Sequence, residues 1–126
     1  MRVLLDTHIL LWVLIEPGRL RKDIAAQIRD PTNEILFSAA SIAEIAIKVA
    51  QGRFGAAPDR IVDAALDSGY AELPVASRHA ARLATLPLHH RDPFDRLLVA
   101  QAIEEPARLL TVDRKLAPYS ELVVVA

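Results

Sequence analysis

Residues 89–102, HHRDPFDRLLVAQA, contain the helix start from which the rest of the fold can be worked out. Asp92 followed by Pro93 is typical of an N-cap and a first helical position, because the missing N–H of proline costs nothing there and its fixed φ suits a helix. Asp95 then falls in the first turn, and at helical spacing it heads an apolar stripe that continues through Val99. We therefore expect Asp95 to lie above an inward-facing apolar surface.

A carboxylate at the position of Asp95 needs a partner. Desolvation disfavours its charged form, so protonation, a hydrogen-bonded partner or a cation must stabilise it. The positive end of the helix dipole contributes only about 0.3–1 kcal/mol. Asp92 is explained by capping alone, whereas Asp95 is a candidate functional residue.

The composition is that of one compact domain covering residues 1–126. Apolar residues make up 52% of the chain and charged residues 25%, as expected for a chain with a single hydrophobic core. The absence of cysteine excludes disulfides and thiolate metal sites and fits the reducing cytoplasm. The apolar run over 9–15 is too short to cross a membrane. Because the net charge is −1, any nucleic-acid contact would depend on local basic clusters.

Strand-like and helix-like segments alternate along the chain. The strands are expected over 2–5, 34–38, 70–73, 108–111 and 122–125, and the helices over 9–15, 21–29, 40–51, 60–68, 78–85 and 93–102. The helix over 9–15 is apolar nearly all round, so we expect it to lie in the interior. The alternation predicts the α/β class, with right-handed crossovers and helices covering both faces of a central, mostly parallel sheet.

Acidic residues follow or adjoin the ends of the predicted strands. They are Asp6, Glu44, Asp95 and Asp113. In open α/β sheets the carboxyl ends of the strands form the ligand crevice where the strand order reverses, so we expect these acids to meet there. Some also have an ordinary explanation, Asp6 as a turn residue and Asp113 as the N-cap of a short helix.

Glu44 has ordinary explanations of its own. Ser41 and Glu44 have the spacing of a capping box, and Glu44 and Lys48 form an i,i+4 pair worth only about 0.2–0.5 kcal/mol. In helical projection Glu44 falls on the side away from the apolar stripe of its helix, which favours a surface position. The sequence leaves these alternatives open.

The predicted gathering of acids has a chemical consequence. Carboxylates within a few ångströms of one another raise one another's pKa values, and a divalent cation would resolve the conflict. Oxygen ligands without cysteine select a hard ion, Mg²⁺ or Mn²⁺, over zinc. His89 and His90 are adjacent, so their side chains diverge and a zinc site is not expected. A hard divalent ion can activate a water and neutralise charge on a phosphodiester, so metal-assisted phosphodiester hydrolysis is the reaction that these residues best serve.

Several segments together resemble PIN-domain proteins, and more narrowly the VapC-type toxins of bacterial type II toxin–antitoxin systems. They are Leu4–His8, Ser41–Ile45 with Lys48, Asp92–Ala102 and Thr111–Asp113. They cover nearly the whole chain in the expected order, and DPFDRLLVAQA is the most specific part. One departure is Ala43, where this subgroup often carries a large aromatic residue before the glutamate. The resemblance implies a PIN-like three-layer α/β/α fold.

The resemblance also implies a metal-dependent endoribonuclease that is the toxin of such a pair. Its catalytic residues and metal ligands would be Asp6, Glu44, Asp95 and Asp113, binding Mg²⁺ or Mn²⁺. Thr7 and Thr111 would be supporting hydroxyls, and Asp92 matches the motif as a cap or as an acid just outside the ligand set. The substrate would be RNA, usually tRNA or rRNA, cut until a cognate VapB-like antitoxin blocks the site. A homodimer is also implied.

Basic side chains lie close to these motifs in the sequence. The candidates to bind RNA phosphates are Arg96, Lys48, Arg91, Arg114 and Lys115. Arg96 is the first choice among them, because it adjoins a predicted ligand. An ordinary solvated charge on a helix face is the alternative for each of them.

Other functions remain open at this point. The chain could be a non-catalytic PIN-fold module that acts by protein association, in which case Mn²⁺ would neither bind nor stabilise it. A phospho-acceptor receiver domain also uses strand-end acids and Mg²⁺. Such a domain carries paired acids after its first strand, however, whereas here Asp6 is followed by Thr7 and His8, so this alternative ranks last.

Overall fold

A five-stranded parallel sheet forms the centre of the computed structural model, which describes residues 1–126. Its strand order is β3-β2-β1-β4-β5, and every neighbouring pair is parallel, as the α/β prediction requires. The strands are β1 (Arg2–Leu5), β2 (Glu34–Ser38), β3 (Ala71–Leu73), β4 (Arg108–Thr111) and β5 (Val123–Val125).

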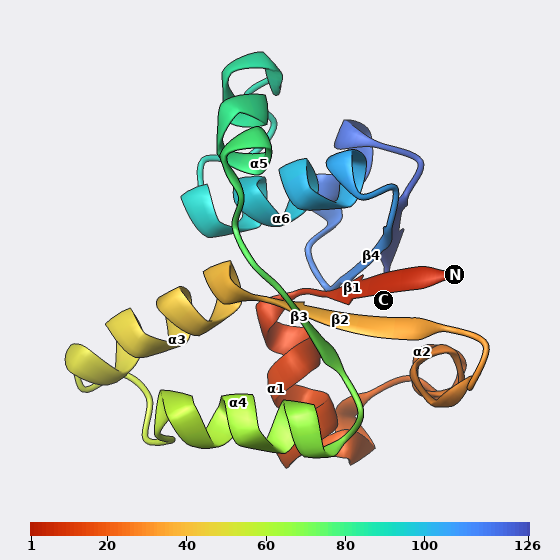
Figure 1. The fold of residues 1–126 in the computed structure, drawn as a ribbon, viewed down its shortest axis with the longest axis vertical. Coiled ribbons are helices and arrows are strands. Elements are labelled where there is room, and N and C mark those ends of the chain that lie inside the picture. The colour runs from red at the N-terminus through yellow and green to blue at the C-terminus, as the bar shows by residue number, and fades with distance from the viewer.

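Helices cover both faces of this sheet. They are α1 (Thr7–Ile15), α2 (Lys22–Arg29), α3 (Ala39–Ala50), α4 (Pro58–Asp67), α5 (Ser77–Arg82) and α6 (Pro93–Glu104), with the short 3₁₀ turns η1 (Pro17–Arg19), η2 (Leu83–Thr85) and η3 (Arg114–Tyr119). Helices α1, α2 and α4 lie on one side of the sheet and α5 and α6 on the other (Figure 1), which confirms the three-layer prediction. No helix has the length and apolar character needed to span a bilayer.

Alternation along the strands divides the core into two parts. Val3 and Leu5 of β1 are fully buried in a cluster with α1, α2 and α4, whereas Leu4 between them is buried in a second cluster with α6. Successive side chains of a strand point to opposite faces, so a strand covered on both sides must be apolar throughout. This is why β1 reads as a continuous apolar run.

The reversal of strand order places one edge of the sheet in position to form a site. From β1 the chain moves outward through β2 to β3, and later returns to β4 on the other side of β1 before reaching β5. The carboxyl ends of β1 and β4 therefore lie side by side at the switch point. Asp6 follows β1 directly, and Thr111 ends β4.

Helix starts differ from the sequence expectations in ways that matter for this edge. The N-cap of α3 is Ser38, whose hydroxyl accepts from the backbone N–H of Ala40 at 3.0 Å, so the proposed capping box of Ser41 with Glu44 is wrong. Helix α1 is not sandwiched in the interior either, because Ile15 is half exposed. Some apolar side chains of this helix therefore lie outside its buried face.

Candidate metal centre

Asp6 lies at the junction of β1 and α1, where it is buried and serves as the N-cap of α1. Its Oδ1 accepts from the backbone N–H of Ile9 at 2.8 Å. Its Oδ2 accepts from the hydroxyl of Thr111 at 2.6 Å and from the backbone N–H of Val112 at 3.1 Å. Burial raises the pKa of Asp6, and these hydrogen bonds offset part of the increase. They also tie the ends of β1 and β4 together.

Glu44 projects from α3 into the same region and is buried, which corrects the expected surface position. Its Oε1 accepts from the hydroxyl of Thr7 at 2.7 Å, and its Oε2 lies 3.2 Å from Nζ of Lys48, so the expected i,i+4 pair is present. The hydroxyl of Ser41, which is also buried, lies 2.9 Å from that of Thr7. Glu44 thus has a partner on each oxygen.

Asp95 lies in the first turn of α6, beside the N-cap Asp92. The carboxylate of Asp92 accepts from the backbone N–H groups of Phe94 and Asp95 at 2.8 and 3.2 Å, so its capping role is seen directly. Desolvation raises the pKa of Asp95 to about 7, and the negative charges of nearby acids add to this increase. These acids are Asp92, Glu44 and Asp6.

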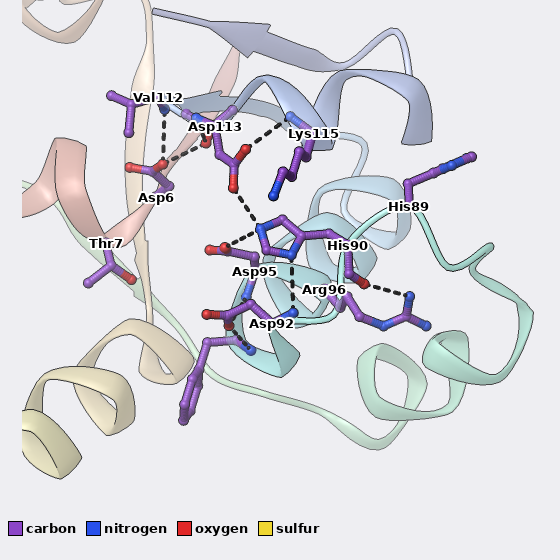
Figure 2. A network of polar contacts seen from close by, with 12 residues as sticks. Asp6, Thr7, His89, His90, Asp92, Asp95, Arg96, Val112, Asp113 and Lys115 are labelled. Atoms are coloured by element: carbon purple, nitrogen blue, oxygen red, sulfur yellow. Dashed lines mark hydrogen bonds and ion pairs between the residues drawn. The ribbon is translucent and has the colours of Figure 1, made fainter.

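Asp113 caps η3 just beyond β4 and lies close to His90 (Figure 2). Its Oδ1 accepts from the backbone N–H of Lys115 at 2.9 Å, and its Oδ2 lies 2.6 Å from Nε2 of His90. The same Nε2 lies 3.3 Å from Oδ2 of Asp95. Ligand atoms of His90, Asp95 and Asp113 all lie within 4.8 Å of one another, which is close enough to surround one ion.

The structure therefore brings the predicted acids to one edge of the sheet in two arrangements. Asp95 and Asp113 meet at His90, whereas Asp6 and Glu44 are each held by their own hydrogen bonds and influence Asp95 electrostatically. Sequence reasoning missed His90, because its pairing with His89 drew attention only to zinc. The available signal was its place two residues before the N-cap Asp92, where its ring can accept the backbone N–H of that residue at 3.1 Å.

The basic residues near the acids differ in how they are engaged. Arg96 donates through its guanidinium to the hydroxyl of Tyr119 and to several carbonyl groups, which belong to Leu83, Leu86, Pro87 and His90. Arg91 and Arg114 are exposed. A shallow pocket of about 320 Å³ opens beside His90, and its charged lining residues are Arg91 and Lys115. Arg96 thus holds the loop before α6, while Arg91 and Arg114 are open to solvent.

A comparison with protein families decides the identity of the fold. The family model described as PIN domain matches residues 3–122. This chain belongs to the PIN domain family. The PIN domain is also 35% identical over 119 residues to Ribonuclease VapC22 of Mycobacterium tuberculosis, a match that spans 93% of this chain and 91% of the relative. The relationship to VapC therefore extends over nearly the full length of both proteins.

Solved structures resemble this PIN domain across its whole length. VapBC2 from Rickettsia felis, bound to a DNA fragment from its promoter, aligns with a TM-score of 0.71 at 15% identity, covering 100% of this chain and 98% of that chain. FitAcB from Neisseria gonorrhoeae aligns with a TM-score of 0.61 at 19% identity, covering 98% and 96%. At these identities the likeness concerns the fold.

Proposed function

We propose that residues 1–126 form a single PIN domain that acts as a Mg²⁺- or Mn²⁺-dependent endoribonuclease, the toxin of a type II toxin–antitoxin pair. The observation that carries the proposal is the gathering of the acids at one edge of the sheet, where ligand atoms of His90, Asp95 and Asp113 lie within 4.8 Å of one another. Desolvation and the charges of neighbouring acids raise the pKa of Asp95 there to about 7. A cation bound at this edge of the sheet would stabilise the ionised forms of these carboxylates. The likeness to Ribonuclease VapC22 supports the nuclease assignment.

The donor set fits a hard divalent cation. It consists of carboxylate oxygens from Asp6, Glu44, Asp95 and Asp113, with no thiolate in the chain. When bound, such a cation would neutralise charge on a phosphodiester and make a water more acidic. Without a cation, the repulsion between the acids is relieved in part by protonation of Asp95, whose pKa is raised to about 7, and by the ion pair of Glu44 with Lys48.

The hydroxyl groups of the site orient two of its acids. Thr111 donates to Asp6, and Thr7 donates to Glu44, so each carboxylate has a fixed rotation before any ligand arrives. A carboxylate that is already fixed loses less conformational entropy when an ion binds. We assign Thr7 and Thr111 to this supporting role and Asp92 to capping α6.

RNA is the proposed substrate, of the tRNA or rRNA class. Arg91 and Arg114 are exposed beside the acids and are the side chains best placed to contact backbone phosphates. The other candidates are Lys115, which is exposed as well, Lys48 and Arg96. Lys48 is already paired with Glu44, and Arg96 is engaged with carbonyl groups, so we assign them a smaller part in RNA binding.

The proposed partner is a cognate VapB-like antitoxin. We also propose that the toxin is a homodimer, to which this antitoxin binds. Solved structures that share this fold are those of VapBC2 and FitAcB, and this likeness supports a VapB-like partner. The acids gathered at the sheet edge provide a negatively charged surface that a basic antitoxin segment could cover, since opposite charges attract across an interface.

A titration with Mn²⁺ tests the proposed function. We expect Mn²⁺ to raise the melting temperature of the wild type, because a ligand of the native state stabilises it, and to support cleavage of structured RNA. Asp95→Asn should lose both effects. Asp63→Asn changes an exposed acid on α4 and should lose neither.

Other outcomes would count against the proposal. RNA cleavage that survives in a folded Asp95→Asn protein would show that the acids are not the active site. A wild type that Mn²⁺ neither binds nor stabilises would favour the non-catalytic interaction module. Asp6→Asn is a less clean variant, because an amide cannot accept all the hydrogen bonds that the carboxylate of Asp6 accepts.

A further inference from the structure

The imidazole of His90 lies between two of the proposed metal ligands (Figure 2). Its Nε2 is 2.6 Å from Oδ2 of Asp113 and 3.3 Å from Oδ2 of Asp95. The side chain is 16% exposed, so most of its contacts are with protein. A histidine in this position could ligate an ion, fill its place or orient the carboxylates.

The other ring nitrogen decides between these roles. The backbone N–H of Asp92 donates to Nδ1 of His90 at 3.1 Å, which requires that Nδ1 carry no hydrogen. The ring hydrogen is then on Nε2, which donates to Asp113 and has no lone pair to offer an ion. Ligation through Nε2 would need the ring to break its bond to Asp92 and change tautomer.

The backbone of His90 is held from two other elements. The hydroxyl of Tyr119 in η3 accepts from the backbone N–H of His90 at 2.9 Å, and the guanidinium of Arg96 in α6 donates to its carbonyl at 3.4 Å. His89 packs its ring edge-on against Tyr119, with the ring centres 4.8 Å apart, and points away from the acids. The ring of His90 is therefore fixed before any ion binds.

We propose that His90 is a positioning residue of the metal centre, which orients the carboxylate of Asp113 toward Asp95 without ligating the ion. The inference rests on the proposed metal-dependent function. Oxygen Oδ2 of Asp113 keeps a second lone pair for an ion while it accepts from His90, so orientation and ligation are compatible. Groups that hydrogen-bond to metal ligands in this way typically change metal affinity about 10- to 100-fold when they are removed.

Two amide side chains of different length, substituted for His90, test the inference. His90→Gln keeps an N–H donor at about the distance of Nε2, whereas His90→Asn keeps an acceptor at the position of Nδ1 but cannot reach Asp113. We expect His90→Gln to retain wild-type affinity for Mn²⁺ within about threefold and His90→Asn to lose about 10- to 100-fold, measured from the EPR signal of free Mn²⁺. His89→Gln is the matched control and should bind Mn²⁺ like the wild type. Thermal unfolding in EDTA checks that each variant folds.

Spectroscopy gives a second readout that does not depend on the variants. Pulsed EPR of Mn²⁺ bound to the wild type should show no directly coordinated nitrogen. A coordinated nitrogen would make His90 a ligand and overturn the inference. If His90→Asn fails to fold, the pulsed spectrum and His90→Gln decide together.

The remaining outcomes separate this inference from the proposed function. Unchanged Mn²⁺ affinity in a folded His90→Asn protein would overturn the positioning role and leave the metal centre intact. Tighter binding in that variant would show that His90 occupies the place of the ion, which also overturns it. A wild type that binds no Mn²⁺ would defeat the proposed function, and the positioning role would fall with it.

Discussion

Asp95 and Asp113 flank the same imidazole, yet their pKa values are shifted in opposite directions. Desolvation and nearby negative charge raise the pKa of Asp95 to about 7. For Asp113 desolvation is outweighed by hydrogen bonds from the backbone N–H of Lys115 and from His90, which lower its pKa. At neutral pH, Asp113 is thus a stable anion, and Asp95 is close to its own titration point. Of these two carboxylates, Asp95 is therefore the one whose charge depends more on whether a cation is present.

Asp95→Asn should change how metal-free stability depends on pH. The folded-state pKa of Asp95 is raised, so its stabilising contribution is complete below its unfolded-state pKa of about 3.9 and is lost as the pH rises through about 7. The amide cannot ionise and avoids this loss. We expect the free energy of unfolding of the variant, relative to that of the wild type, to rise by about 1 kcal/mol between pH 5 and pH 8. The value is modest because Asp95 is partly solvated and solvent screens its charge. Urea unfolding in EDTA at both pH values measures it.

Asp63→Asn serves as the control for that experiment, because Asp63 is exposed on α4, away from the acids. Its difference from the wild type should be the same at both pH values. If Asp95→Asn gained nothing on the wild type between pH 5 and pH 8, or lost stability relative to it over that range, the electrostatic interpretation would be wrong.

Helix α6 and the loop before it form the element that organises the site. The N-cap Asp92 starts the helix, Asp95 lies in its first turn, and Arg96 one residue later donates hydrogen bonds to carbonyl groups of the loop. Arg96 is well suited to this because a planar guanidinium can donate to several carbonyl groups at once. The sequence alone predicted Arg96 as the first candidate for RNA contact, and nothing in it indicated that the same side chain also holds this loop.

Arg96→Lys distinguishes the roles of this arginine. An ammonium keeps the positive charge but cannot donate to so many acceptors, so we expect a loss of roughly 1–3 kcal/mol in the free energy of unfolding. Amide hydrogen exchange over 83–90 should become faster. A variant as stable as the wild type that has lost RNA binding would instead show that Arg96 contacts RNA directly.

The whole molecule has a net charge of −1, so its overall field does not attract RNA. The proposed binding of RNA would then depend on the few exposed cations beside the acids. Each phosphate contact with single-stranded RNA contributes about 0.7 to the slope of log affinity against log salt concentration. We expect the double variant Arg91→Ala, Arg114→Ala to reduce that slope by about 1.4, measured with a non-cleavable RNA.

Arg60→Ala is the control for the salt experiment, since Arg60 is exposed on α4, across the sheet from α6. It should leave the slope unchanged. An unchanged slope in the double variant would place the RNA on a different surface of the molecule.

The sequence by itself determined which segments form strands and helices, and that their acids would gather at one edge of a parallel sheet. Periodicity, capping and turn signals depend on residues a few positions apart, so they can be read without the fold. Only the tertiary structure decided that Glu44 is buried and that His90 lies between Asp95 and Asp113. The contact of His90 with Asp113 spans 23 positions and that of Asp6 with Thr111 spans 105. Such contacts exist only once the sheet has brought its strand ends together, because no local pattern encodes which distant side chains will meet.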